Sequence, residues 1–92
     1  MSEIHELDAQ FALAQADVKE LPERPGNLTL LRLYALYKQA SLGDVQGDKP
    51  DFTDIAGKYK YDAWSALAGT PQDAAKQQYI GLVESLKSGE SA

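Results

Sequence analysis

Apolar residues recur every three or four positions along most of this chain, and this spacing is the strongest constraint on its fold. The N-terminal third carries the spaced set Leu7, Phe11, Ala14, Val18 and Leu21. Residues at this spacing share one face of an α-helix, while the acids and amides between them cover the opposite face. The pattern predicts an amphipathic helix, which Pro22 and the pair Pro25-Gly26 end.

A second helical segment runs from Leu30 to Ala40 and continues to Gly43, the residue that we expect just beyond its C-terminal end. Either Asn27 or Thr29 can cap its N-terminus with a side-chain oxygen. Apolar residues occupy most of the circumference of this helix. It is therefore expected to lie at the centre of the fold, with contacts on several sides.

Residues 43–54 are rich in turn formers and show neither helical nor alternating periodicity, so they predict a long ordered loop. Loops of this length within a small domain are often functional. A third, shorter helix is predicted from around Ile55 to Ala68, with Gly69 as its stop signal.

The fourth helix has the clearest start signal of the chain. Thr70 can cap it, Pro71 suits its first position, and Asp73 complements the cap and the helix dipole. Its apolar stripe consists of Ala75, Tyr79, Leu82 and Leu86. Gly81 costs this helix about 1 kcal/mol relative to alanine, so either another backbone passes close to it or nothing selects against it. We expect the helix to end before Gly89.

No segment alternates with a period of two, so no strand is predicted. The sequence indicates a single all-α domain over residues 1–92, a four-helix bundle with a long loop between its second and third helices. The short connections after the first and third helices favour antiparallel neighbours there. The long loop allows the second and third helices to be either non-adjacent or parallel.

Composition excludes several classes of chemistry. The 92 residues include no cysteine, which rules out disulfides, thiolate nucleophiles and cysteine-based zinc sites. The one histidine, His5, lies in an acidic segment, where a solvated side chain is a better interpretation than a general base. No pair of acids is set apart by an apolar environment, and no glycine pattern matches a phosphate-binding loop. The chain is therefore predicted not to be an enzyme and to need no metal or cofactor.

The N-terminal segment is acidic and lacks the basic start and apolar centre of a signal peptide. No apolar run approaches the roughly 18 residues that a membrane-spanning helix needs. These features predict a soluble, cytoplasmic protein.

The formal net charge of −5 argues against an anionic ligand, but this charge is unevenly distributed. Residues 1–31 carry six acids and two bases, and residues 61–92 carry four acids and two bases. Residues 32–60, in contrast, carry four acids and five bases. Nucleic acid is disfavoured because duplex binding needs a continuous basic stripe, whereas a compact phosphate ligand needs only a few focused lysines.

Two blocks of aromatic residues and lysines lie in that middle third. Tyr34, Tyr37 and Lys38 follow i, i+3, i+4 spacing, which places them on one side of the second helix. Lys58 and Lys60 follow on the third helix. Lysine ammonium groups suit phosphate, and a tyrosine ring can stack on a purine for about 1 to 3 kcal/mol. The blocks are therefore a candidate site for a phosphorylated aromatic compound.

Core packing is the competing interpretation for the aromatic residues. Tyr34 and Tyr37 can equally be core aromatics whose hydroxyl groups reach the surface. The pattern alone assigns Trp64 to the core and Tyr79 to core packing with a solvated hydroxyl.

Taken together, the blocks resemble the acyl-coenzyme A-binding protein family, and the resemblance extends over most of the chain. The matching residues of the first half are Phe11, Ala14, Val18-Lys19, Leu21, Leu33-Tyr34, Tyr37-Lys38-Gln39-Ala40 and Gly43-Asp44. Those of the second half are Pro50, Gly57-Lys58, Lys60, Asp62-Ala63-Trp64, Leu67, Gly69-Thr70, Ala74, Tyr79-Ile80, Val83-Glu84 and Leu86-Lys87.

The resemblance implies a bundle that binds medium- to long-chain acyl-CoA esters and serves as an intracellular carrier and pool former. Tyr34, Lys38 and Lys60 would contact the phosphates of the 3′-phospho-ADP group. Tyr37 would stack on or flank the adenine, and Tyr79 would line the site, while the acyl chain is sheltered in a groove. Family positions near the ligand are also occupied by Lys19, Leu30 and Leu31.

The chain departs from the family at Ala56, Tyr59 and Tyr61, where Lys, Ala and Trp are common. The residues before the family's usual start either extend the first helix or remain loose. We expect a monomer with transient contacts to acyl-CoA-using enzymes or membranes. The alternative function is a helical protein–protein interaction module that binds its partner in an exposed apolar groove and has no lipid ligand.

Overall fold

The computed structural model describes residues 4–47, 49–51 and 53–89 of the chain, with the side chains of Ile4 and His5 left out of the description. Its helices are α1 (Ile4–Lys19), α2 (Asn27–Leu42), α3 (Ile55–Ser65) and α4 (Gln72–Lys87). The described residues contain no strand, so the all-α prediction is confirmed. Of the residues before the family's usual start, those from Ile4 onward extend the first helix, while residues 1–3 lie outside the described part of the chain.

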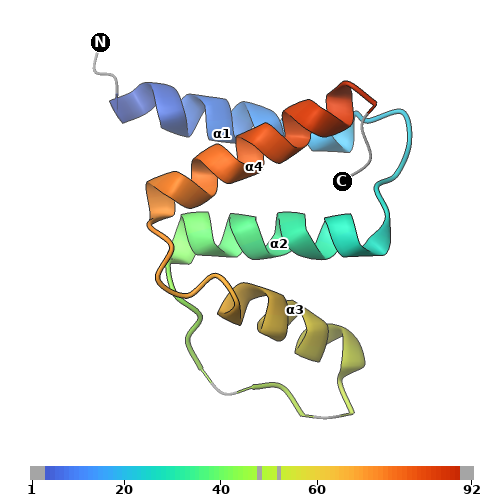
Figure 1. The fold of residues 1–92 in the computed structure, drawn as a ribbon, viewed down its shortest axis with the longest axis vertical. Coiled ribbons are helices and arrows are strands. Elements are labelled where there is room, and N and C mark those ends of the chain that lie inside the picture. Colours follow the sequence, from blue (N-terminus) through green and yellow to red (C-terminus); the bar gives the residue numbers. More distant parts are fainter. Residues whose placement is uncertain (1–3, 48, 52, 90–92) are drawn as a thin grey trace.

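The four helices form a flat, elongated body, with extents of 44 × 32 × 16 Å. Figure 1 shows them side by side in the order α1, α4, α2, α3, and backbone packing joins only the neighbours in this order. The short connections were expected to join packed neighbours, and this prediction is wrong for both. Although α1 and α2 run in opposite directions, α4 lies between them, and α2 likewise separates α3 from α4. The helices α2 and α3 are parallel and packed together, one of the two arrangements that the long loop allows.

The buried core is built by three helices, which we call the three-helix core. It consists of Phe11 and Ala14 from α1, Leu33, Leu36 and Ala40 from α2, and Ala75, Tyr79 and Val83 from α4. The prediction of a central second helix is confirmed, because α2 packs on both α3 and α4. In contrast, none of the residues of α3 is fully buried.

Ion pairs reinforce the contact between α1 and α4. Lys76 Nζ lies 2.7 Å from Asp8 Oδ1, and Lys87 Nζ lies 3.0 Å from Asp17 Oδ2. These carboxylates raise the pKa of both lysines, chiefly through the hydrogen bonds that they accept. The first and last helices are thus held together by charged contacts at two levels along their length.

The helix ends agree only partly with the sequence. Gly43 follows α2 with a φ of 81°, a left-handed conformation that glycine adopts without strain, as predicted. The residue before α2 is Gly26, and no side chain caps this end, so neither Asn27 nor Thr29 is the cap. Asn27 is already helical, and Thr29 is buried within the first turn.

The ends of α3 and α4 show similar corrections. Asp54 caps α3, because its Oδ1 accepts a 3.0 Å hydrogen bond from the backbone N–H of Gly57. This helix ends at Ser65 and passes through a turn, so it is shorter than predicted. No side chain caps α4, which begins after Pro71. Thr70 is therefore not its cap, and its carbonyl oxygen accepts a hydrogen bond from elsewhere in the chain.

Gly81 lies on the exposed side of α4, and a Cβ added there would meet no atom within 4 Å. No other backbone in the described part of the chain passes close to it. Of the two explanations considered for this glycine, the close backbone approach is therefore wrong.

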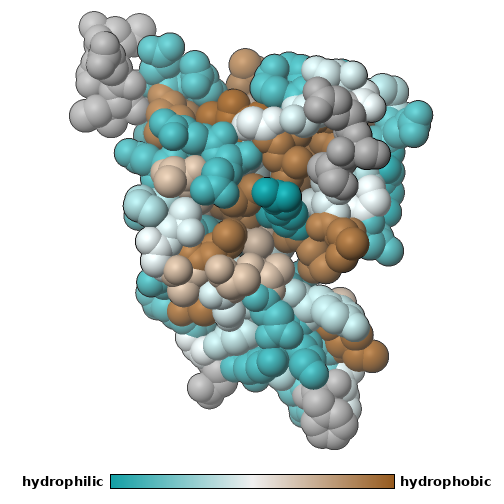
Figure 2. All heavy atoms as spheres, in the orientation of Figure 1, coloured by the Kyte–Doolittle hydropathy of each residue, from teal (hydrophilic) through white to brown (hydrophobic). Residues whose placement is uncertain are grey.

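The apolar surface is concentrated on part of the molecule. In Figure 2 the brown, hydrophobic side chains gather over the middle of the visible face, along α2 and α4, while hydrophilic side chains cover much of α1 and α3. Among the large apolar side chains, Leu28 at the start of α2 is 82 % exposed. The surface of the three-helix core is thus not uniformly polar.

Candidate functional site

Four side chains from α2 and α3 form a lysine–aromatic cluster, which we define as Tyr34, Lys38, Lys60 and Trp64. Both helices contribute a pair at i, i+4 spacing, so each pair lies on one helix face. The ammonium nitrogens of Lys38 and Lys60 lie 5.7 Å and 5.3 Å from the centre of the Tyr34 ring. Lys38 Nζ also lies 5.9 Å from the centre of the Trp64 ring. These distances fall within the range of cation–π attraction.

The cluster brings together residues that the sequence placed on separate helices. Tyr34 and Lys38 come from α2, and Lys60 joins them from α3 across the packed contact between these helices, which we call the α2–α3 seam. Lys58, also on α3, is exposed and makes no contact with the cluster among the described residues. Lys19 is exposed at the C-terminal end of α1.

Ion pairing divides the lysines of the chain into two groups. Lys49 pairs with Asp62 at 2.9 Å, and Lys76 and Lys87 pair with carboxylates of α1. The lysines without an ion pair to any described carboxylate are Lys19, Lys38, Lys58 and Lys60. These are the same lysines that the sequence placed at the ligand. Their positive charge is left available for an anion, although the protein is acidic.

A second aromatic group borders the cluster on the side of α1 and α4. The ring of Phe11 lies 5.2 Å from the ring of Tyr79 in an edge-to-face arrangement, and 6.2 Å from the ring of Tyr37. Tyr79 is only 5 % exposed, whereas Tyr37 is 38 % exposed. Burial, and next the proximity of Tyr37, raise the pKa of Tyr79. Tyr37 therefore has one side packed on Phe11 and enough free surface for a ligand.

Leu30 and Leu31 are both half-buried but belong to different environments. Leu30 packs against the three-helix core. Leu31 lines a groove of about 300 Å³ between α2, α3 and α4, together with Leu28 and Arg32. Because Leu28 and Tyr34 are six residues apart on one helix, they point about 120° apart around its axis. The groove thus occupies a different side of α2 from the tyrosines.

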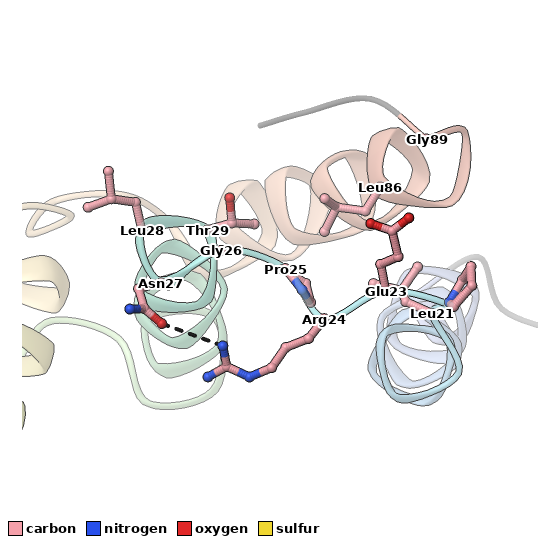
Figure 3. Close-up of a pocket in the computed structure, with 11 residues that line it drawn as sticks. Leu21, Glu23, Arg24, Pro25, Gly26, Asn27, Leu28, Thr29, Leu86 and Gly89 are labelled. Carbon is pink, nitrogen blue, oxygen red and sulfur yellow. Dashed lines mark hydrogen bonds between the residues drawn. The ribbon is translucent and has the colours of Figure 1, made fainter.

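A larger depression, of about 570 Å³, lies where the connection between α1 and α2 meets the end of α4 (Figure 3). Arg24 crosses its edge and donates a 3.5 Å hydrogen bond to Asn27 Oδ1. Neither depression is lined by a residue of the lysine–aromatic cluster. We assign the candidate site to the cluster because its charges and rings carry recognition chemistry, which depression size alone does not supply.

A hydrogen-bonded junction supports the cluster at the C-terminal end of α2. The indole Nε1–H of Trp64 donates to the Gly43 carbonyl oxygen at 2.8 Å. Gln39 Nε2 donates to Asp44 Oδ1 and to the Thr70 carbonyl oxygen, both at 2.8 Å. These contacts tie the end of α2 to the connection between α3 and α4.

Asp44 is the charged member of this junction. It accepts hydrogen bonds from the backbone N–H of Gly69, at 2.9 Å, and from Gln39. The bond from Gly69 and next that from Gln39 lower the pKa of Asp44, because both favour the carboxylate. The amide Oε1 of the fully buried Gln39 has no hydrogen-bond partner among the described residues. The two hydrogen bonds that Nε2 donates favour this orientation of the amide, since a flipped group would set its oxygen against two other acceptors.

Trp64 is the residue that the sequence placed least well. It was assigned to the core, but it is half-buried, lies outside the core cluster and contacts Lys38 instead. A signal for this position was present, because Trp64 follows Lys60 at the same i, i+4 spacing as Lys38 follows Tyr34. Gln39 and Asp44 also received no role from the sequence, although both stand in the block that carries the resemblance.

Metal binding and membrane insertion have no support within the described residues. These residues contain no group of three or more His, Cys, Asp or Glu side chains that could hold a metal ion. His5, the candidate that the sequence had already set aside, lies outside the described side chains. None of the described helices has the length and apolar character needed to cross a bilayer.

Comparison with known proteins points to one family. The sequence model of the family described as "Acyl CoA binding protein" matches residues 8–83. The chain is 47 % identical over 77 residues to the acyl-CoA-binding protein homolog of Drosophila melanogaster, and the match covers 84 % of this chain and 90 % of that one. It is also similar in structure to acyl-CoA-binding protein 2 of Oryza sativa, with a TM-score of 0.89, 33 % identity and coverage of 95 % of both chains.

One relative has the name of an enzyme. The chain is 48 % identical over 82 residues to enoyl-CoA delta isomerase 2 of Rattus norvegicus. This match covers 89 % of the present chain but only 21 % of the isomerase. The isomerase name therefore describes a much longer protein, of which a small part resembles this chain.

Proposed function

The chain belongs to the acyl-CoA-binding protein family, and we propose that it binds medium- to long-chain acyl-CoA esters without turnover and carries them as a soluble intracellular pool. The observation that carries this proposal is that Lys38 and Lys60 lie close to the Tyr34 ring and have no carboxylate partner among the described residues. In an acidic protein, unpaired ammonium groups focused on one seam attract a compact polyanion and leave extended nucleic acid unfavoured.

In the proposed complex the head group binds along the α2–α3 seam. Lys38 and Lys60 bind phosphate oxygens of the 3′-phospho-ADP group, with Tyr34 between them as an aromatic support and hydroxyl donor. The short distances of both ammonium groups to the Tyr34 ring support this assignment. They show that the two positive charges lie near one point before a ligand binds, which lowers the cost of binding. Lys19 and Lys58 contribute longer-range attraction from the edges of the site.

The adenine and the acyl chain make the apolar contacts. We assign Tyr37 to the adenine, because its ring combines exposed surface with a fixed base on Phe11. Tyr79 and Leu30 line the site further in, with Leu31 at its periphery. Burial of each methylene contributes up to about 0.8 kcal/mol, so a long acyl chain supplies on the order of 10 kcal/mol before entropy and incomplete burial are subtracted. The acyl chain provides most of the affinity, and the phosphates provide specificity over free fatty acids.

Titration calorimetry with palmitoyl-CoA, free CoA and palmitate tests this function directly. We expect palmitoyl-CoA to bind much more tightly than either of the other two, because only the ester engages both the lysines and the apolar surface. Equal affinities for palmitate and palmitoyl-CoA would contradict the proposed role of the head group. A series of esters from octanoyl-CoA to stearoyl-CoA would then define the preferred chain length.

The alternative, a protein-interaction module with no lipid ligand, makes a different prediction for thermal stability. A ligand that binds only the folded state stabilises it, by an amount that grows with the logarithm of the ligand concentration relative to Kd. Palmitoyl-CoA at a hundred times its Kd is expected to add about 2.7 kcal/mol to the free energy of unfolding. An unchanged melting temperature in the presence of the ester would favour the interaction module instead.

A further inference from the structure

Trp64 connects the backbone at the end of α2 with the ammonium group of Lys38. Its indole N–H donates a 2.8 Å hydrogen bond to the carbonyl oxygen of Gly43, which fixes the orientation of the ring. The ring centre then lies 5.9 Å from Lys38 Nζ. Trp64, on α3, is thus held by the backbone at the C-terminal end of α2. It in turn contacts Lys38, which lies about one turn before that end.

This contact changes what Lys38 can do. A lysine has a flexible four-carbon stem, and Lys38 forms no ion pair with any described carboxylate that would hold its head group in place. It has two aromatic neighbours instead, Tyr34 at 5.7 Å and Trp64 at 5.9 Å from the ring centres. Since Lys60 approaches the same Tyr34 ring at 5.3 Å, repulsion between the two ammonium groups favours moving Lys38 away. The Trp64 ring provides attraction that opposes this movement.

Core packing does not account for this position. Trp64 is half-buried, α3 contributes no fully buried residue, and the core cluster is complete without the indole. Tryptophan is also the side chain that gives the strongest cation–π attraction. The hydrogen bond to Gly43 and the contact with Lys38 use both properties of the indole, its donor and its ring.

We propose that Trp64 is a positioning residue for anion binding, which holds Lys38 at the α2–α3 seam in the place where it meets a ligand phosphate. This inference rests on the proposed function. It assigns Trp64 no contact with the ligand, so its effect on affinity must pass through Lys38. The expected effect of losing the ring is about a two- to sixfold weakening of binding, the range of an exposed cation–π contact.

A double-mutant cycle tests the inference. Binding of palmitoyl-CoA is measured for the wild type, Trp64→Leu, Lys38→Met and the double variant. Trp64→Leu is expected to weaken binding by about two- to sixfold in the wild-type background and to have no further effect once Lys38 is replaced. The same fold-loss in both backgrounds would overturn the inference, since it would show that Trp64 acts independently of Lys38. Absence of binding by the wild type would refute the proposed function itself.

Trp64→Phe is a second variant for the case that Trp64→Leu does not fold. It removes the hydrogen-bond donor but keeps an aromatic ring. It is expected to retain a part of the affinity that Trp64→Leu loses. Side-chain NMR of the ligand-free protein gives a second readout. The rings should shift the ε-methylene protons of Lys38 upfield in the wild type, less in Trp64→Phe and least in Trp64→Leu. Unchanged Lys38 shifts in both variants would overturn the inference even if affinity fell.

Discussion

The three-helix core and the α2–α3 seam use the same helix, α2, in two different ways. Toward α4, α2 presents buried apolar residues such as Leu36 and Ala40, and α4 is further tied to α1 by ion pairs. Toward α3, it presents half-buried Tyr34 and Lys38, whose partners are a lysine and an indole. The core side stabilises the fold, and its ion pairs between α1 and α4 neutralise charge, whereas Lys38 and Lys60 on the α3 side have no carboxylate partner among the described residues. Stability and recognition are therefore assigned to different sides of one helix.

The largest expected effect tests the core side of this comparison. Leu36 is 2 % exposed, so Leu36→Ala is expected to lower the free energy of unfolding by about 2 to 5 kcal/mol, through lost burial and a residual cavity. Chemical denaturation measures the change. Leu28→Ala on the same helix is the matched control, because that side chain is 82 % exposed and should change stability by no more than about 0.5 kcal/mol. Similar losses in the two variants would disprove the division between core and surface on α2.

In the α2–α3 seam, by contrast, a substitution is expected to lower ligand affinity more than stability. Lys38→Met should weaken palmitoyl-CoA binding by about 1.5 to 3 kcal/mol, because a charge-assisted contact to phosphate is lost. The free energy of unfolding should change by less than about 1 kcal/mol, the range of an exposed cation–π contact. Calorimetry and denaturation on the same sample separate these quantities. A large loss of stability with unchanged affinity would make Lys38 a structural residue.

Lys76→Met provides the matched control for that experiment, since it removes the same charge from a lysine that pairs with Asp8 across α1 and α4. Binding should be retained. Stability should fall by at most about 1 kcal/mol, because Asp8 is more than half exposed and solvent screens the pair. If Lys76→Met weakened binding as much as Lys38→Met, net charge rather than the cluster would govern affinity.

A smaller effect is expected on the outer face of the core. Gly81→Ala should raise the free energy of unfolding by about 1 kcal/mol, since alanine is the better helix former and the added methyl meets no neighbour within 4 Å. A thermal melt that shows destabilisation would reveal a contact at this position. Affinity for palmitoyl-CoA should not change.

The smallest effect concerns the pH dependence of the junction beneath the seam. The pKa of Asp44 is lowered in the folded protein from its ordinary value of 3.8, so its contribution to stability is fully present above that value. The contribution is lost as the pH falls below 3.8 through the folded-state pKa. In acid titrations of unfolding, Asp44→Asn should therefore differ from the wild type at neutral pH and converge with it in acid. Glu20→Gln, at an exposed position, serves as the control, and an equal effect there would exclude a special role of Asp44.

The sequence predicted the positions of the helices better than it predicted which helices pack against each other. The spacing of residues such as Phe11 and Tyr79 identifies buried faces, because the periodicity of a helix is a local property. Which faces pair depends on the fit between side chains that are distant in the sequence, and short connections did not determine it here. The helix starts were also misjudged. A side chain such as Thr70 can cap a helix, but its backbone was needed for the tertiary contact with Gln39.

The candidate site was also predicted only in part from the sequence. Spacing alone placed Tyr34 beside Lys38, and the second block of lysines and aromatic residues added Lys60 from the next helix, which the fold brings to the same ring. The position of Trp64 could not be read from its residue type, because large aromatic side chains are commonly buried and only the packing of α3 decides otherwise. The place of Leu31 in the groove between α2, α3 and α4 likewise depends on where α3 and α4 meet α2.

The pairing of α1 with α4 has a consequence for synthesis of the chain. A protein emerges from the ribosome with its N-terminal end first, so α1 is made before α2 and α3. The helix on which its backbone packs, α4, is made after them. Until residues 72–87 have emerged, the apolar face of α1 has no backbone partner, and the long segment between the two helices must close before they meet. The helices α2 and α3 can meet earlier, but α3 brings no buried residue to that contact. The core is therefore completed only after α4 has emerged.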